Sequence, residues 1–239
     1  MTPINQQAVD RYWALEMGYG SGLPQEVAGV TCTAQEAYTG VQFLRRGESL
    51  VIASPPQGVS SITQGVRDLP CHEVFSVEFV ERLLGPNISK VLGPAHVSYA
   101  DRSTFRAAAV ATCRLLTPGD DAARHELVAA MSPAELEQSG LDSEEAPAFG
   151  EFADGVLCAV ASYRTWEPRI AHIIVATHPH HRRRGHGQRV VSALAVHALA
   201  NDLILQYRAL AVNSNSLALA KSLGFQPYGS TLYARLRSA

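Results

Sequence analysis

One stretch of the chain combines arginine and glycine at a spacing that could bind an anion. Ile173–Gln188 consists of an apolar run, a loop with two glycines, and the start of a helical pattern. Such a loop lets successive backbone N–H groups point at one spot, where the helix N-terminus adds about half a positive charge. Gly185 and Gly187 allow close approach of a phosphate, and the arginines of 182–184 add positive charge. The loop therefore predicts a phosphate-binding site.

Three phosphate-binding motifs compete for this loop. A Walker loop needs Gly-Lys-Ser/Thr, and the loop contains no lysine. A dinucleotide fingerprint needs a third glycine, but Val190 stands three residues after Gly187. What remains is Arg-x-x-Gly-x-Gly, from Arg182 to Gly187. On these six positions alone, a glycine-rich helix start that binds no ligand is an equal alternative.

This pattern resembles the coenzyme A pyrophosphate loop of the GNAT superfamily of acyl-CoA-dependent N-acyltransferases. A second segment, Asn213–Phe225, is similar to the closing segment of that superfamily: an asparagine at a strand end, a short helix, then Leu-Gly-Phe. Cys113–Asp120 looks like its opening strand and turn. The resemblance covers residues 107–239. Relatives with this form of the closing segment often carry an extra amino-terminal half, which fits the 106 residues left uncovered.

The resemblance implies acetyl-CoA as co-substrate and assigns roles to individual residues. The backbone of the strand end at Val175–Thr177 would pair with the pantetheine arm, and the Thr177 amide would polarise the thioester carbonyl as a catalytic group. Loop amides would hold the pyrophosphate, and the segment from Asn213 would flank the pantetheine. The full set implied to bind the cofactor is Val175, Ala176, Thr177, Arg182, Arg183, Arg184, Gly185, His186, Gly187, Gln188, Asn213, Ser216 and Ala220.

Two positions depart from the superfamily pattern. Ala220 stands where the family often has a tyrosine acid, and Ala171 stands where it often has a glutamate base. A thiol of pKa ~8.5 leaves as thiolate near pH 7.5 at a cost of only about 1.4 kcal/mol. Deprotonating an amine of pKa ~10.4 costs about 4 kcal/mol at that pH. The missing base is therefore the larger gap.

His172 is the nearest substitute base in sequence, with an intrinsic pKa suited to the task. Adjacent strand residues face opposite sides, however, so His172 should point away from the position of Ala171 unless a bulge turns it. A packing histidine is the alternative. A base from the first half, a bound water, or one of three further side chains would also serve: Glu167, Tyr207 and Tyr233.

Histidines around the loop raise the question of a metal site. They have ligand spacing, but we expect no carboxylate or cysteine nearby and therefore no metal there. They are His178, His180, His181 and His186. The cysteines are spread singly and form no CxxC pair, which predicts small buried hydrophobic residues rather than disulfides or zinc ligands. They are Cys32, Cys71, Cys113 and Cys158.

The elements that must position these residues indicate an α/β fold with a mixed sheet. We expect a GNAT domain over 107–239 and a smaller α/β domain over 1–106, with a substrate-side role or a degenerate GNAT-like origin. Serine caps open helices after Ser76 and Ser132, and Asp154-Gly155 marks a hairpin. Expected strands are 49–53, 91–99, 107–116, 170–177, 203–212 and 225–236; expected helices are 6–17, 121–131, 187–200 and 214–223.

Composition narrows the class of protein. The 239 residues are 46% hydrophobic and 18% charged with a net charge of −2, which fits a globular protein and disfavours a nucleic-acid binder. No apolar run reaches the ~18 residues of a membrane span, and no secretory signal pattern opens the chain, so we expect a cytoplasmic protein. We expect acetyl transfer to the amine of a small molecule. A homodimer of the chain is compatible with this expectation. The rivals are a coenzyme A-binding module without catalysis and a nucleic-acid binder.

Overall fold

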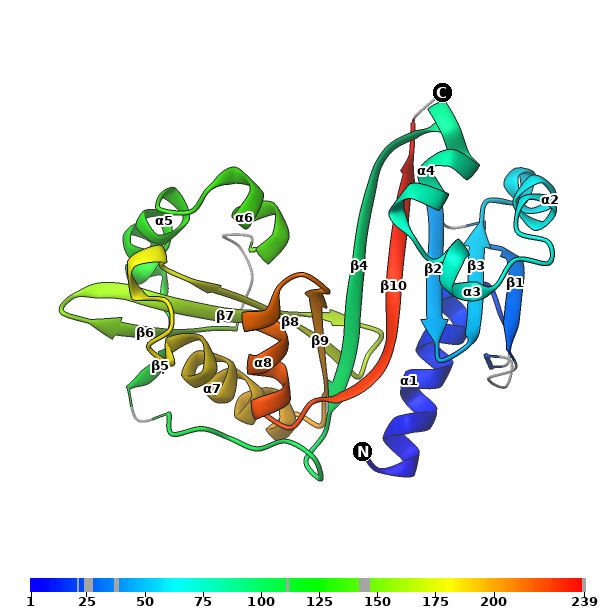
Figure 1. Ribbon diagram of the computed structural model, residues 1–239. Helices are drawn as coiled ribbons and strands as arrows, with labels where there is room; N and C mark the ends of the chain where they lie inside the picture. Colours follow the sequence, from blue (N-terminus) through cyan, green and yellow to red (C-terminus); the bar gives the residue numbers. More distant parts are fainter. Residues whose placement is uncertain (21, 24–27, 37–38, 111, 142–146, 238–239) are drawn as a thin grey trace. The chain divides into compact units, whose positions relative to one another are not determined.

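The computed structural model describes residues 1–239 except 21, 24–27, 37–38, 111, 142–146 and 238–239. The chain divides into two compact units, each described here by itself (Figure 1). The N-terminal unit comprises residues 3–98, 209–214 and 227–239, and the C-terminal unit comprises residues 1–2, 99–208 and 215–226. This division differs from the expected boundary at residue 106, because the last strand joins the sheet of the first unit.

The N-terminal unit contains strands in the order β1-β3-β2-β10-β4. β10 pairs antiparallel with β2, from Ser230 opposite Arg45 to Arg235 opposite Gly40. Alternate residues of β2 and β3, such as Phe43 and Ile52, pack with buried side chains of α2–α4 in one core. The bounds are β1 Gly29–Ala34, β2 Gly40–Arg46, β3 Ser49–Ser54, β4 Ile88–Ala100, β10 Gln226–Leu236, α1 Pro3–Glu16, α2 Pro56–Gly65, α3 Cys71–Val74 and α4 Val77–Leu84.

The C-terminal unit contains strands in the order β9-β8-β7-β6-β5. β5 to β8 pair antiparallel, whereas β8 and β9 are parallel, so the sheet is mixed as expected. One stripe of α7 is fully buried, as its 3.6-residue period predicts: Val190, Val191, Leu194, Ala195 and Ala198. The bounds are β5 Cys113–Leu115, β6 Ala148–Ala153, β7 Val156–Trp166, β8 Ile170–Thr177, β9 Ile204–Leu210, α5 Asp121–Ala129, α6 Pro133–Ser139, α7 His186–Ala200 and α8 Ser214–Ser222.

Local signals predicted most of these elements. Ser76 and Ser132 cap α4 and α6 with side-chain hydrogen bonds, and Asp154-Gly155 turns between β6 and β7 at positive φ. The expected strand over 107–116 is wrong for 107–110, because among the described residues of that range only Cys113–Leu115 form a strand. The elements expected from sequence did not include β1, β2, α2 or α3. Among the described helices, none has the length and apolarity that a membrane crossing requires.

The physical reason for the shortened strand lies in its hydrogen-bond partners. The Arg106 N–H donates to the carbonyl of Leu223 at 2.9 Å, and the Ala108 N–H donates to the Ser192 hydroxyl at 3.0 Å. These backbone donors therefore bind the end of α8 and a side chain of α7 instead of a neighbouring strand. Apolar composition alone could not reveal this.

Candidate functional site

Within the part of the chain that the structure describes, the end of β8 has a neighbouring strand on one edge only. β8 pairs with β7 along its whole length, from Trp166 opposite Ile170 to Ala159 opposite Thr177. Its parallel pairing with β9 covers Ile170–His172 alone, although both strands continue. Residues 173–177 therefore lie beyond the last paired residues of β9. The two strands part at this point.

The backbone groups of β8 point alternately to its two edges. The N–H of His178 donates to the carbonyl of Cys158 at 2.8 Å, which fixes the alternation of the antiparallel ladder. Ala176 therefore faces β7, whereas Val175 and Thr177 direct their N–H and C=O groups to the edge that β9 has left. An extended ligand arm could pair with these groups in the manner of a strand.

A tight loop joins β8 to α7. Arg183 and Gly185 adopt left-handed φ angles of 61° and 80°, and α7 begins at His186. Gly185 has no side chain with which to cap the helix, so the first N–H groups of α7 face outward from its end. A Cβ atom at Gly187 would lie 3.1 Å from Thr177 Oγ1 and 3.3 Å from Leu219 Cδ1. Glycine thus lets the helix end approach β8 and α8 closely.

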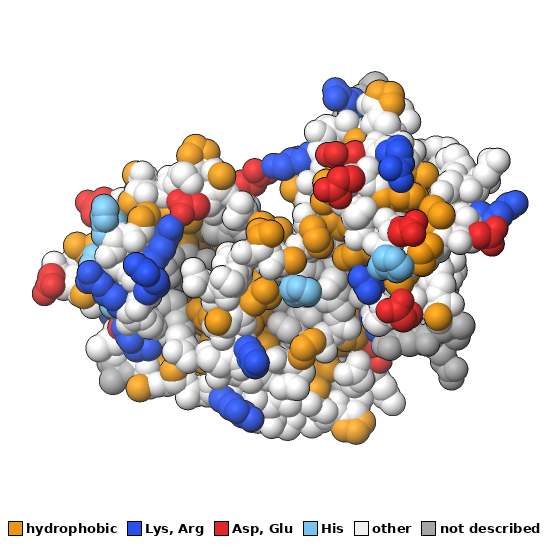
Figure 2. All heavy atoms as spheres, in the orientation of Figure 1, with side chains coloured by type: hydrophobic (Ala, Val, Ile, Leu, Met, Phe, Trp, Pro, Cys, Tyr) orange, Lys and Arg blue, Asp and Glu red, His pale blue; other side chains and the backbone are white. Residues whose placement is uncertain are grey.

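The three loop arginines differ in their surroundings. Arg182 forms an ion pair with Glu135 of α6 at 2.6 Å, and its Nε donates to the carbonyl of Thr177 at 3.3 Å. The hydrogen bond from Arg182, with help from Ser132, lowers the pKa of Glu135 to about 2. Arg183 and Arg184 are exposed, and Figure 2 shows basic side chains and histidines gathered on this side of the C-terminal unit. Arg182 ties the loop to α6, while the other two offer charge to solvent.

His172 has an environment that disfavours protonation. Its ring stacks on Trp166 with centroids 4.2 Å apart, and its Nδ1 lies 3.0 Å from Gln206 Oε1. The guanidinium of Arg208 lies 4.5 Å from the centre of the Trp166 ring. Burial, followed by the charge of Arg208, lowers the pKa of His172 to about 3. The side chain is therefore a neutral packing group near neutral pH.

The other residues singled out from sequence lie in several places. Glu167 is exposed in the turn before β8, at the opposite end of that strand from Thr177. The hydroxyl of Tyr207, whose pKa burial raises, lies 2.9 Å from that of Ser216 on α8. Tyr233 lies on β10 in the N-terminal unit, and Asn213 is exposed just before α8. The two positions that depart from the superfamily pattern, Ala171 and Ala220, are buried.

Residues 149–231 match the family model described as GNAT acetyltransferase. This part of the chain is a GNAT domain. A GNAT-family protein from Novosphingobium aromaticivorans superposes with a TM-score of 0.54 at 23% identity, covering 64% of this chain and 69% of the other. An acetyltransferase from the GNAT family of Colwellia psychrerythraea gives a TM-score of 0.50 at 16% identity, covering 66% of this chain and 61% of the other. A search of curated proteins found no match.

Both likenesses, at less than 25% identity, concern the fold alone. A third structure, the acetyltransferase YncA from Salmonella typhimurium, is described with its cofactor acetyl-CoA. It has a TM-score of 0.39 at 19% identity and covers 53% of this chain and 92% of its own.

Behind the loop of the GNAT domain, the structure brings a cysteine and a carboxylate to the histidines. Cys158 Sγ lies 3.2 Å from His181 Nδ1, and His186 Nδ1 lies 2.9 Å from Glu151 Oε2. The expectation that neither residue type lies near the histidines is therefore wrong. The signal that could have found the cysteine is the register of the β6–β7–β8 strands, because this register places Cys158 beside the end of β8.

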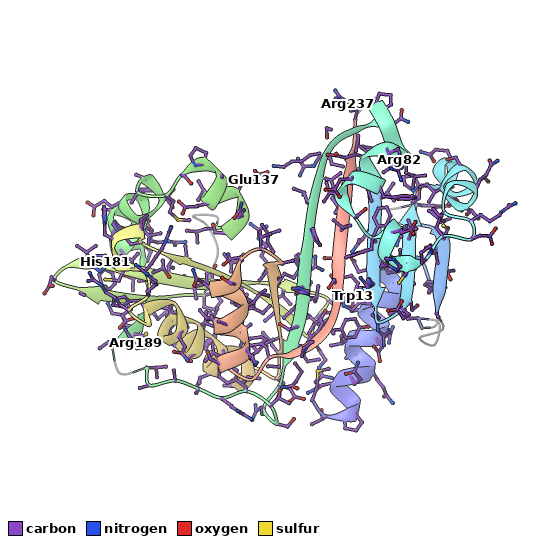
Figure 3. All side chains as sticks on the ribbon, viewed as in Figure 1. Trp13, Arg82, Glu137, His181, Arg189 and Arg237 are labelled. Carbon is purple, nitrogen blue, oxygen red and sulfur yellow. The ribbon has the colours of Figure 1, made fainter. Side chains whose placement is uncertain are left out.

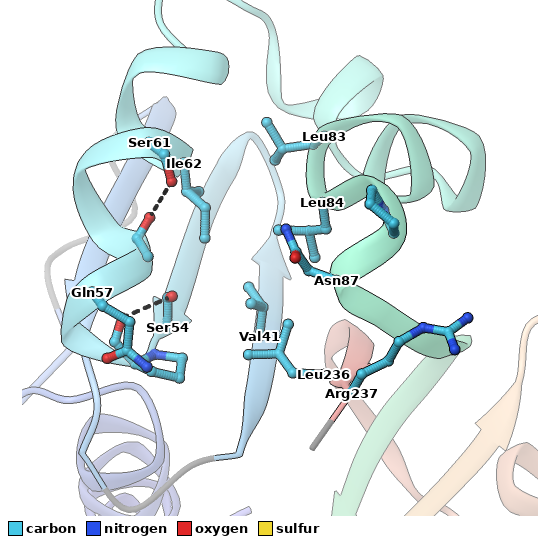
Figure 4. A pocket seen from close by; sticks show the side chains of 13 residues that line it. Val41, Ser54, Gln57, Ser61, Ile62, Leu83, Leu84, Asn87, Leu236 and Arg237 are labelled. Carbon is cyan, nitrogen blue, oxygen red and sulfur yellow. Dashed lines mark hydrogen bonds between the residues drawn. The ribbon is translucent and has the colours of Figure 1, made fainter. Parts of the chain in front are cut away.

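The N-terminal unit has a pocket of about 520 Å³ between α2, the end of α4 and the last residues of β10 (Figure 4). The hydroxyls of Ser54 and Ser61 donate to carbonyls close by in sequence, those of Pro55 and Gly58. Arg237 is the one ionisable residue among those that line the pocket. Because a guanidinium keeps its proton, this pocket supplies no general base.

Proposed function

We propose that this protein transfers an acetyl group from acetyl-CoA to the amine of a small molecule. Membership of residues 149–231 in the GNAT acetyltransferases supports acetyl transfer as the reaction class. The observation that carries the proposal for this chain is the parting of β8 from β9 after His172, next to a glycine loop and a helix N-terminus. One edge of β8 and one helix end thus face the same region of the domain.

In this proposal the cofactor lies along the strand end and the loop. The backbone of Val175 pairs with the amide groups of the pantetheine arm, and the N–H of Thr177 lies at the thioester end of that arm. The N–H groups of residues 183–188 hold the pyrophosphate, because that loop ends in the uncapped first turn of α7. Ser216 of α8 flanks the arm, whereas the side chain of Arg182 holds the loop against α6 rather than the phosphates.

The chemistry is direct attack of the amine on the thioester. The C–N bond forms as the C–S bond breaks, and the N–H of Thr177 donates to the oxygen that becomes negative in between. The thiolate leaves at little cost, since its pKa is ~8.5. His172, with a pKa lowered to about 3, takes no part in deprotonating the amine. The reacting species is therefore the free amine, and its proton passes to water.

The variant Thr177→Pro tests the role of the Thr177 amide. Proline removes the N–H that points away from β7, while the hydrogen bonds between β7 and β8 do not use it. We expect kcat to fall about 10²–10³-fold, as for loss of an oxyanion donor, with coenzyme A affinity changed little. Thr177→Ala is the matched control, because it removes the side chain and keeps the amide, and it should retain most of the activity.

Two measurements precede this kinetic comparison. Acetyl-CoA at millimolar concentration should raise Tm, because a ligand that binds only the folded state stabilises it. Circular dichroism should show that the proline variant keeps its fold. Wild-type turnover by a folded Thr177→Pro variant, or no Tm shift with the cofactor, would contradict the proposed function.

A coenzyme A-binding module without turnover is the second candidate. The alanine at position 171, buried where the family often has its base, and the depressed pKa of His172 favour it. Assays against a panel of amines separate the two candidates. Cofactor binding with no turnover of any amine across pH 7–10 would support the module, and turnover of one amine would support the enzyme.

A further inference from the structure

Three side chains of the types that bind transition metals meet behind the loop of the GNAT domain. Cys158 comes from β7, His181 from the short 3-10 helix Pro179–His181, and His186 is the first residue of α7. One ligand atom of each lies within 4.8 Å of the other two, and Cys158 Sγ lies 3.2 Å from His181 Nδ1. Figure 3 places His181 on the loop beside β7 and Arg189 on α7. The proposed acetyl transfer uses none of these three side chains.

The spacing of these atoms is close to that of a zinc site. With Zn–S of about 2.3 Å and Zn–N of about 2.0–2.1 Å, tetrahedral geometry separates ligand atoms by roughly 3.3–3.6 Å. Cys158 Sγ and His181 Nδ1, 3.2 Å apart, lie just below this range. The remaining separations need to shrink by at most about 1.5 Å. The half-buried side chain of His181 can move toward His186 by rotation, whereas the buried side chains of Cys158 and His186 must themselves close any remaining separation between them.

A carboxylate orients His186 for coordination. Glu151 Oε2 lies 2.9 Å from His186 Nδ1, and its other oxygen accepts from Arg189 Nε and from the Thr112 hydroxyl, both at 2.7 Å. Arg189 Nη2 also lies 3.0 Å from His186 Nδ1. In the tautomer whose Nδ1 donates to Glu151, Nε2 keeps its lone pair for a metal. Metal-bound histidines commonly donate their second nitrogen to a carboxylate in this way.

We propose that Cys158, His181 and His186 bind a divalent ion of the zinc class. One thiolate and two imidazoles form a ligand set that suits zinc and disfavours magnesium or calcium, which prefer oxygen. Three protein ligands leave the fourth tetrahedral position for water. The ligands lie on both sides of residues 182–185, so the ion fastens both ends of the anion loop to β7. The proposal does not rest on acetyl transfer.

Cobalt(II) titration of the untagged full chain tests this site. A cobalt–thiolate bond gives a charge-transfer band in the near ultraviolet, and we expect it to saturate at one equivalent and to disappear when zinc is added. Cys158→Ser should abolish the band, and His181→Gln should weaken cobalt binding at least tenfold. Cys71→Ser is the control for a buried cysteine, and His180→Gln is the control for an exposed loop histidine; both should bind as wild type does.

Zinc content and thermal unfolding complete the test. Wild-type protein loaded with zinc and freed of excess ion should hold one equivalent, and a chelator should lower its Tm; neither effect should occur in Cys158→Ser. His181→Gln keeps the buried residues intact, so it answers the question even if the serine variant fails to fold. No charge-transfer band, or full zinc binding by both ligand variants, would overturn the proposal and leave a hydrogen bond between Cys158 and His181 only.

Discussion

Gly224, the glycine of the closing Leu-Gly-Phe, can be tested as a structural requirement rather than a ligand contact. It lies at the end of α8 with a φ angle of 82°. A Cβ atom there would lie 2.1 Å from the carbonyl oxygen of Thr104 and 3.3 Å from Arg106 Cγ. The first of these contacts is with backbone, which cannot rotate away. The variant Gly224→Ala should therefore destabilise the C-terminal unit through two separate effects.

The two effects have different magnitudes. An L side chain in the left-handed region costs about 1–2 kcal/mol. Forcing an extra carbon into a packed backbone contact costs typically about 1–3 kcal/mol more. We therefore expect Gly224→Ala to lower the free energy of unfolding by roughly 2–5 kcal/mol. Gly155 separates the terms, because its φ is 80° and a Cβ atom there meets nothing within 4 Å. Gly155→Ala should cost only the first.

Urea unfolding followed by circular dichroism compares the two variants. Both glycines lie in the C-terminal unit, so both changes act on the same unfolding transition. The midpoint for Gly224→Ala should fall clearly below that for Gly155→Ala, with coenzyme A affinity at low urea close to wild type. Equal midpoints would refute the packing argument, and a loss of cofactor affinity without loss of stability would make Gly224 a ligand contact.

Two further predictions concern pH. With His172 neutral and uninvolved, the log of the rate should keep rising with pH toward the pKa of the substrate amine, and His172→Gln should leave this pH profile unchanged. If the variant were about a hundredfold slower and the wild-type profile bent near pH ~6.5, His172 would be the base after all. The Arg182–Glu135 pair should stabilise the fold above pH ~4.5 and lose that effect as pH falls toward 2, because the folded pKa of Glu135 is lowered to about 2. Unfolding of Glu135→Gln and wild type at pH 6 and pH 3 checks the sign: the difference between them must shrink at the lower pH.

The sequence by itself determined the features that depend on near neighbours in the chain. The apolar stripe of α7, the serine caps of α4 and α6, the Asp154-Gly155 turn and the glycine loop all follow from residues within a few positions of one another. Strand alternation likewise separated His172 from the position of Ala171. Such features follow from sequence because helix period, capping and turn angles are set locally.

Only the tertiary structure decided the features that join distant segments. It pairs β10 with β2, and it binds the backbone of 106–108 to α7 and α8 instead of a strand. It stacks His172 on Trp166 beside Arg208, which lowers the pKa of the histidine. It brings Cys158 and Glu151 to histidines that lie more than twenty positions away in sequence. Burial, cross-strand register and charge proximity are properties of the packed chain, and no local pattern encodes which distant residues will supply them.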